Sequence, residues 1–240
     1  MKWKRLRVAV MCFILLAGYG CAPPAYRIHP EFEARRQDIR APGLIPPDVK
    51  IYEFSAGGIR ELRDDWCSEG EKNLMNALME GFEKKTCEIE VFSVDEGIRD
   101  DMEDIQALYR AVSASIQMHT YGPHVFPEKK ETFDYSIGSI KDVLQKLDAD
   151  AMIFVYGLDE ISTGGRKALM VAGILAGAVT GVALMPRSGI TAVSVALVDS
   201  SGTVLWYGAK GGAGACDLRN AESTTNLVQT LLADFPRIGP

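Results

Sequence analysis

Imidazole and carboxylate groups are the first side chains to consider for chemistry, because they transfer protons and bind metal ions. His119, His124 and Glu128 could form a metal site, but their spacing does not place them on one helix face, and Pro123 lies between them. Four acidic residues are clustered in 100–104. They would stabilise the amino-terminal end of a helix dipole, and paired catalytic carboxylates are the weaker interpretation. The sequence therefore predicts no metal and no catalytic residue at these positions.

The sequence also lacks motifs that bind phosphate or activate a serine. The glycine-rich stretch 208–214 contains no Gly-Lys-Ser or Gly-Lys-Thr, and it does not have the strand-to-helix pattern of a phosphate-binding fingerprint. No serine occupies a Gly-x-Ser-x-Gly turn. We therefore expect no cofactor and a protein that is not an enzyme.

The amino terminus has the pattern of an export signal. Met1–Arg7 carries four basic side chains, Val8–Ala17 is apolar throughout, and small residues precede Cys21. This order is that of a cleaved bacterial secretion signal. Ten apolar residues form a helix of about 15 Å, half the thickness of a bilayer core, so we expect that residues 1–20 are removed.

The residues Ala17–Cys21 resemble the lipobox of bacterial lipoproteins. In that family the cysteine thiol receives a diacylglycerol and the new amino terminus is acylated, for example with palmitate, so Cys21 is the predicted lipidation site. Gly18 departs from the Leu that is usual at its position, and ordinary secretion is the alternative. Ala22 stands where an Asp would resemble the inner-membrane retention signal. The resemblance therefore implies a lipid anchor in the outer membrane, with the protein facing the periplasm.

Three further cysteines remain in the mature chain, namely Cys67, Cys87 and Cys216. The first two lie at opposite ends of a predicted helix about 30 Å long, which argues against a direct disulfide between them. A disulfide from Cys216 to either one and buried free thiols both stay open. No Cys-x-x-Cys occurs, so the sequence suggests neither a thioredoxin-type site nor a zinc knuckle.

The composition is that of an ordinary globular protein: 240 residues, 47% hydrophobic and 24% charged, with a formal net charge of −6. Four of the 26 basic residues lie in the first seven, so removal of residues 1–20 leaves 22 basic against 32 acidic residues. This acidic balance argues against nucleic acid or anionic lipid as the main partner.

The mature chain begins with a predicted tether. Residues 21–48 hold the lipidated cysteine and six prolines, with scattered charge and no apolar period. The domain is expected at 49–236. It opens with a strand at 49–54, a helix from a capping box at Ser68 to residue 85, and a strand at 87–92. This strand, helix, strand order predicts a parallel pair with a right-handed crossover.

The remaining apolar periods predict further helices and strands. In chain order these are helices at 98–118 and 140–147, strands at 151–156, 191–198 and 203–207, and a helix at 218–234. The run 151–156 is continuously apolar, as expected of a central strand buried on both faces. A turn at 199–202 joins the next two strands into a hairpin, and a glycine-rich loop is expected at 208–214.

The most unusual segment is 168–185, which carries no charge and lies within the predicted insertion 166–187. Gly173, Gly177 and Gly181 are four residues apart, the spacing that lets a second helix approach closely. Three interpretations stay open: a helix or helical hairpin that is buried or covered by a partner, insertion into a membrane, and a self-association face. Because glycine lowers helix stability, the segment needs a packing partner.

A second resemblance rests on Asp148–Ala151 before the buried strand, Val195–Trp206 with its Asp-Ser-Ser-Gly turn, and Phe235–Pro236. Together they resemble a broad group of periplasmic lipoproteins, which includes the curli-secretion lipoproteins and the auxiliary lipoproteins of ABC-type transport systems. The resemblance implies a sheet-edge hairpin beside an α/β core. Curli-secretion proteins carry membrane-spanning strands between these stretches, and the glycine spacing of 168–185 departs from them, so pore formation is not implied.

These observations predict an α/β fold: a mixed sheet of about five strands, three to four flanking helices and an apolar helical segment rich in glycine and alanine. We expect a non-enzymatic outer-membrane lipoprotein, an accessory or assembly subunit of an envelope transport or secretion complex. It would bind a protein partner or a second copy of itself, and no nucleic acid. One alternative is an envelope hydrolase or small-ligand binder at the acidic helix start or around His119. Another is a membrane-active oligomer built on the glycine-rich segment.

Overall fold

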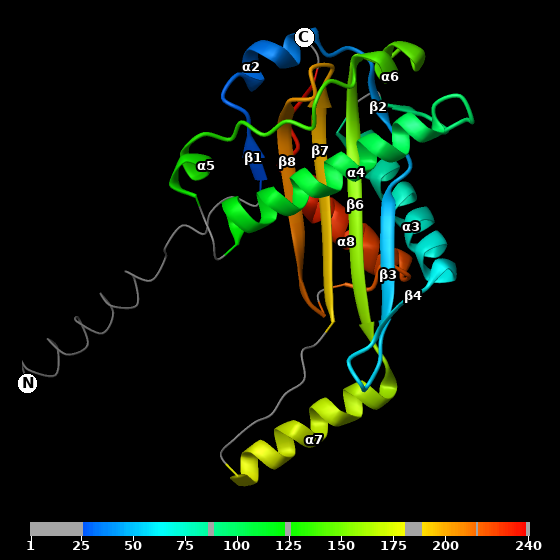
Figure 1. The fold of residues 1–240 in the computed structure, drawn as a ribbon, viewed down its shortest axis with the longest axis vertical. Coiled ribbons are helices and arrows are strands. Elements are labelled where there is room, and N and C mark those ends of the chain that lie inside the picture. Colours follow the sequence, from blue (N-terminus) through cyan, green and yellow to red (C-terminus); the bar gives the residue numbers. More distant parts are fainter. Residues whose placement is uncertain (1–25, 86–88, 123–125, 181–188, 215, 239–240) are drawn as a thin grey trace, which may run out of the picture.

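A computed structural model of the protein describes residues 26–85, 89–122, 126–180, 189–214 and 216–238. These residues form an α/β fold around one mixed sheet (Figure 1). The strands are β1 (Tyr26–Ile28), β2 (Pro42–Leu44), β3 (Asp48–Phe54), β4 (Arg60–Leu62), β5 (Glu90–Val91), β6 (Ala151–Ser162), β7 (Ile190–Asp199) and β8 (Val204–Ala213). The helices are α2 (Phe32–Arg35), α3 (Asp64–Lys84), α4 (Arg99–Ile116), α5 (Pro127–Glu131), α6 (Lys141–Lys146), α7 (Gly164–Thr180) and α8 (Ala221–Leu232), with short helical turns η1 (Arg36–Asp38) and η2 (Gln117–Tyr121). The predicted α/β class is confirmed, and the sheet is larger than predicted.

Strand β6 holds the centre of this sheet. Its first half pairs with β2 and its second half with β3, in both cases in parallel, while β7 pairs with its other edge antiparallel. β8 and then β1 continue the sheet beyond β7, and β5 and β4 pair with β2 and β3. The predicted hairpin is therefore confirmed as β7 and β8, and the continuously apolar run 151–156 lies in the central strand.

The predicted tether at 21–48 is wrong from Tyr26 onward. β1 pairs with β8, and β2 lies between β5 and β6, so this stretch is part of the sheet. The prolines are compatible with this because Pro42 is the first residue of β2 and 46–47 lie between two strands, where a missing N–H removes no ladder hydrogen bond. Strands of three residues are too short to produce an apolar period that the sequence would reveal.

The predicted unit of strand, helix and strand is present as β3, α3 and β5, with two differences. The two strands are parallel but not neighbours, because β3 pairs with β6 whereas β5 pairs with β2. Helix α3 begins at Asp64, before the predicted cap at Ser68. The Ser68 hydroxyl instead donates to the Asp64 carbonyl at 3.0 Å, inside the helix. Asp64 and Asp65 stand in the first turn, where their negative charges interact favourably with the positive end of the helix dipole.

Two hydrophobic cores cover opposite faces of the sheet. α3 and α8 pack on one face, where Trp206 and Leu74 are fully buried. α4 packs on the other, over Phe154 and Tyr207, and its predicted apolar seam is confirmed by buried Met102 and Tyr109. Figure 1 shows α4 crossing one part of this face, while the parts of β6, β7 and β8 toward α7 carry no described helix. The candidate site lies on that part of the sheet.

The predicted glycine-rich loop at 208–214 is wrong. β8 continues to Ala213 and stays paired with β7 as far as Ile190. Glycine weakens an isolated strand, but here a long antiparallel partner supplies the ladder hydrogen bonds that hold it extended. At Gly211 the strands lie so close that a Cβ would stand 2.2 Å from the carbonyl oxygen of Thr191.

The predicted turn between β7 and β8 is confirmed, and Gly202 is its constrained residue. Its φ is +82°, in the left-handed region, and an added Cβ would lie 1.7 Å from the carbonyl oxygen of Gly138. Gly58, in the turn between β3 and β4, has a φ of +84° but open space around the same position. The two glycines therefore share a backbone conformation and differ in their surroundings.

We expect Gly202→Ala to lower the free energy of unfolding by about 2–4 kcal/mol, since it adds a steric clash to the cost of left-handed backbone. Gly58→Ala is the matched control and should lose only about 1 kcal/mol, because its methyl group meets nothing. Urea unfolding of both variants measures the difference. Equal losses would contradict the close approach of Gly138 to the turn.

Candidate functional site

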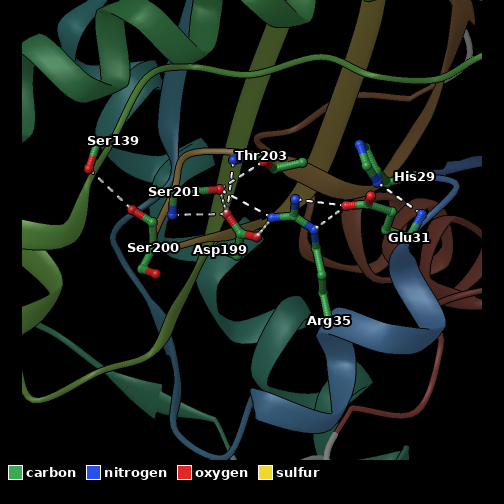
Figure 2. Close-up of polar contacts among 8 residues, drawn as sticks. All are labelled: His29, Glu31, Arg35, Ser139, Asp199, Ser200, Ser201 and Thr203. Carbon is green, nitrogen blue, oxygen red and sulfur yellow. Dashed lines mark hydrogen bonds and ion pairs between the residues drawn. The ribbon is translucent and has the colours of Figure 1, made fainter.

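An extensive polar cluster surrounds Asp199, where β7 enters its turn (Figure 2). Oδ1 of Asp199 accepts hydrogen bonds from the Ser201 N–H at 3.0 Å, the Ser201 hydroxyl at 2.6 Å and the Thr203 N–H at 3.0 Å. Oδ2 accepts from Nη1 of Arg35 at 2.7 Å, and Arg35 also pairs with Glu31 at 2.8 Å. One carboxylate thus joins the turn to α2.

This cluster contains a histidine, an aspartate and a serine, but it lacks the order of a catalytic triad. Nδ1 of His29 accepts from the Glu31 N–H at 3.1 Å, and the Ser201 hydroxyl donates to a carboxylate rather than to an imidazole. Asp199 raises the pKa of the Arg35 guanidinium, which keeps the ion pair charged. The arrangement closes a turn and positions α2, which is a structural role.

A groove of about 580 Å³ lies on the face of the sheet that α4 only partly covers. Tyr156 and Leu158 of β6, Ala192 of β7 and Ala209 and Gly211 of β8 contribute to it. Leu158 is half-buried and Ala192 is exposed, so apolar surface is accessible there. The small side chains on β7 and β8 leave room for a bound group to approach the strands. We call this feature the α4 groove.

The floor of the α4 groove is a network of hydroxyl groups that satisfy one another. Oγ of Ser113 lies 3.1 Å from Oγ of Ser194 and 2.8 Å from Oη of Tyr207. Tyr109 Oη lies 3.1 Å from Ser194 Oγ, and the Gln117 amide donates to Tyr207 Oη at 2.8 Å. Burial raises the pKa of both tyrosines, so their phenols remain protonated at neutral pH. These groups order the groove and offer no base.

The chemistry of the α4 groove is therefore that of a binding surface. Among the described residues that line it there is no carboxylate, imidazole or thiol, so none of them is suited to accept a proton at neutral pH. Its apolar walls and a few fixed polar groups fit the general pattern of a ligand or partner site. Arg110 at its border is paired with Asp48 of β3.

A second cavity of about 240 Å³ lies beside the start of α7 and does contain acid and thiol groups. Asp159 is fully buried; its carboxylate accepts from the Thr191 hydroxyl at 2.8 Å and from the Leu218 N–H at 3.0 Å. Burial raises the pKa of Asp159 and also that of the Cys216 thiol. A thiol that keeps its proton is a weak nucleophile. We assign Asp159 to holding the chain before α8 against the sheet.

The structure does not bring the other predicted candidates together. The four acidic residues in 100–104 are all exposed at the start of α4, and Asp101 pairs with Lys146 of α6 at 2.7 Å. His119 stacks on Phe126 with ring centroids 4.2 Å apart. His124 lies outside the described residues. Within the described ranges, no three His, Cys, Asp or Glu side chains are grouped to hold a metal ion.

The cysteines and glycines singled out by the sequence fall in three places. Cys67 and Cys216 are half-buried free thiols. Gly173 and Gly177 lie in α7, so the predicted helix is confirmed there. This helix extends away from the sheet (Figure 1). The other three, Cys21, Cys87 and Gly181, lie outside the described residues. No helix in the described part of the chain is long and apolar enough to cross a bilayer.

Sequence reasoning missed the α4 groove. Ser113 and Ser194 are the local signal that could have found it, because Ser113 stands on the apolar side of α4 and Ser194 among the apolar residues of β7. Buried serines need hydrogen-bond partners, but the sequence does not say that Tyr207 supplies one.

Comparison with known proteins adds no assignment, because no family model and no curated protein matches the chain.

We expect the stability difference between wild type and Asp159→Asn to be about 1–3 kcal/mol in acid and to shrink as pH rises. The amide can accept only one of the two hydrogen bonds that the carboxyl group accepts, which destabilises the variant. The folded wild type holds the Asp159 proton more tightly than the unfolded chain does, because the pKa is raised from 3.8. Wild-type stability therefore falls as pH rises above that value.

Urea unfolding between about pH 2.5 and pH 8 tests this expectation. Asp217→Asn is the control with the opposite sign, because the Arg219 side chain lowers the pKa of Asp217, so its contribution to stability is present above pH 3.8 and is lost as the pH falls below that value. The difference for Asp217→Asn should therefore grow as the pH rises to about 4.5 and stay constant above it. A difference for Asp159→Asn that also grows would contradict the buried, proton-holding carboxyl group.

Proposed function

We propose that this protein is a non-enzymatic lipoprotein on the periplasmic face of the outer membrane, where it acts as an accessory or assembly subunit of an envelope transport or secretion complex. The export pattern before Cys21 supports the anchor. The resemblance of 148–236 to periplasmic lipoproteins supports the class. The observation that carries the proposal is the α4 groove, a hollow apolar surface whose polar groups are arranged for contact and not for proton transfer.

The occupant that best fits the α4 groove is an apolar segment of a partner protein. Leu158, Ala192 and Ala209 present apolar atoms, and Gly211 exposes main chain beside them. Burying such surface removes it from water, which stabilises a complex by roughly 25 cal/mol per Å² before the cost of association. The hydroxyl network below it is already satisfied. The Tyr121 hydroxyl in its lining is buried and has no hydrogen-bond partner among the described residues.

Helix α7 is the second contact element of this proposal. Gly173, Gly177 and Gly181 are the face that we propose for a partner or a second copy, because small residues four apart allow close approach of helices. The exposed side chain of Leu169, one turn before Gly173 on the same side of the helix, adds apolar surface to this face.

We expect Ala192→Arg to remove a specific protein crosslink that the native envelope forms with the wild type. The long charged side chain fills the α4 groove, and because Ala192 is exposed, the fold itself should tolerate the change. Ala107→Arg, on the exposed surface of α4 outside the lining of the groove, is the matched control and should keep the crosslink. Crosslinking and mass spectrometry report both variants. Crosslinks that survive in Ala192→Arg would place the partner elsewhere.

We expect Cys21→Ala to abolish incorporation of labelled palmitate and to remove the protein from the outer-membrane fraction. The thiol is the predicted acceptor of the diacylglycerol, and several acyl chains bind a membrane far more strongly than one. Metabolic labelling followed by fractionation measures both effects. A wild type that carries no palmitate would favour ordinary secretion and contradict the lipoprotein assignment.

A further inference from the structure

One end of the molecule collects strongly exposed apolar side chains. Ile59, in the turn between β3 and β4, is 71% exposed, and Leu169 and Val171 at the start of α7 are 50% and 57% exposed. We call the turn 55–59 together with α7 the apolar end. Both parts lie at the same end of the sheet in Figure 1, where β3 and β6 finish.

The two parts of the apolar end are joined by defined contacts. The Arg166 guanidinium stacks on the Phe54 ring at 3.6 Å, and its Nη1 donates to the Ser55 carbonyl at 3.0 Å. The Thr163 N–H donates to the Phe54 carbonyl at 3.0 Å. Arg166 is only 4% exposed, so it is part of this joint. These contacts fix the turn 55–59 to the start of α7.

The charge of this part of the chain is opposite to that of the whole protein. No acidic residue occurs between Glu160 and Asp199, whereas Arg166, Lys167 and Arg187 do. The net charge of −6 belongs to the whole chain and argues against an anionic surface that contacts the protein over a large area. It does not argue against contact between an anionic surface and this one end. The exposed Lys167 is attracted to anionic lipid headgroups, and the exposed apolar side chains of α7 gain by leaving water at the membrane interface.

The sheet restricts how α7 could meet a bilayer. β6 and β7 are neighbours, with Asp159 opposite Thr191, so the chain leaves and re-enters the sheet at the same end. A single crossing of the membrane would put the two strands on opposite sides, which their pairing forbids. The 17 residues of α7 also measure about 25 Å, less than the hydrocarbon core of about 30 Å. Lipid contact must therefore be made from one side.

The length of chain before the sheet places the same end near the anchor. Tyr26 pairs with Gly208, and β8 runs five residues further to Ala213, about 17 Å toward the apolar end. Cys21 stands five positions before Tyr26, a distance of at most about 18 Å along the chain. A lipidated Cys21 can therefore reach at most about as far as the end of β8, where Ala213 pairs with Ile190.

We infer that the apolar end is a second membrane contact, in which Ile59 and Val171 enter the lipid headgroup and acyl boundary while Lys167, one turn before Val171 on the same side of α7, lies among the headgroups. This inference rests on the proposed lipid anchor at Cys21, since that anchor holds the domain at the bilayer. The bound surface is that of a phospholipid bilayer, and the contact orients the domain with α7 toward the lipid.

Depth-dependent fluorescence quenching tests the inference on the full lipidated protein in phosphatidylethanolamine and phosphatidylglycerol vesicles that contain brominated acyl chains. Val171→Trp places a reporter in the apolar end. Leu108→Trp is the matched control, because Leu108 is 51% exposed on α4. We expect the bromolipid to remove about half of the emission that Val171→Trp adds and to leave that of Leu108→Trp unchanged. Adding Ile59→Glu to Val171→Trp should reduce the quenching.

Other outcomes would overturn the inference in distinguishable ways. Equal quenching of both reporters would mean that the domain lies on the bilayer through another face. Blue-shifted Val171→Trp emission without quenching would show that α7 packs against protein, such as a second copy of the chain, instead of lipid. No quenching while the protein stays bound to the vesicles would reject the second contact but keep the anchor. Palmitate labelling of the same preparation reports independently on the proposed lipoprotein.

Discussion

The length of β6 relative to the helices above it is the constraint on which the rest of this structure depends. Its 12 residues extend about 40 Å, whereas the 18 residues of α4 measure about 27 Å and lie across the strands. One helix cannot cover that face. The other face needs both α3 and α8. The α4 groove is therefore a consequence of architecture, and the small residues of β7 and β8 keep it open.

The sequence predicts those parts of the fold that repeat a pattern over many residues. α4 has an apolar seam over five turns and was predicted at nearly its observed position. The continuous apolar run 151–156 predicted only the first half of β6, which continues to Ser162. β1, β2, β4 and β5 have two or three residues each, and no period can be read from so few. β8 was predicted too short because its glycines 208–212 look like a loop, while pairing with β7 determines their conformation.

The candidate site was less predictable than the fold, because its residues come from separate elements. Ser113, Ser194 and Tyr207 are far apart in the chain and meet only when α4 packs on the sheet. Asp159 looks like a surface residue that ends a strand, and its burial depends on the chain before α8. The α7 segment was found from sequence because an uncharged stretch between basic residues is a local property.

Because the sheet begins at Tyr26, a lipid anchor at Cys21 would restrict how the domain is oriented at a membrane. A tether of residues 21–48 would let the domain turn freely above a membrane, but β1 begins at Tyr26 and shortens the free chain to about 18 Å. So short a connection restricts orientation. With the apolar end toward the lipid, the α4 groove opens beside the bilayer, between α4 and the start of α7. A partner bound in it would lie close to the membrane, where the proposed envelope complex would assemble.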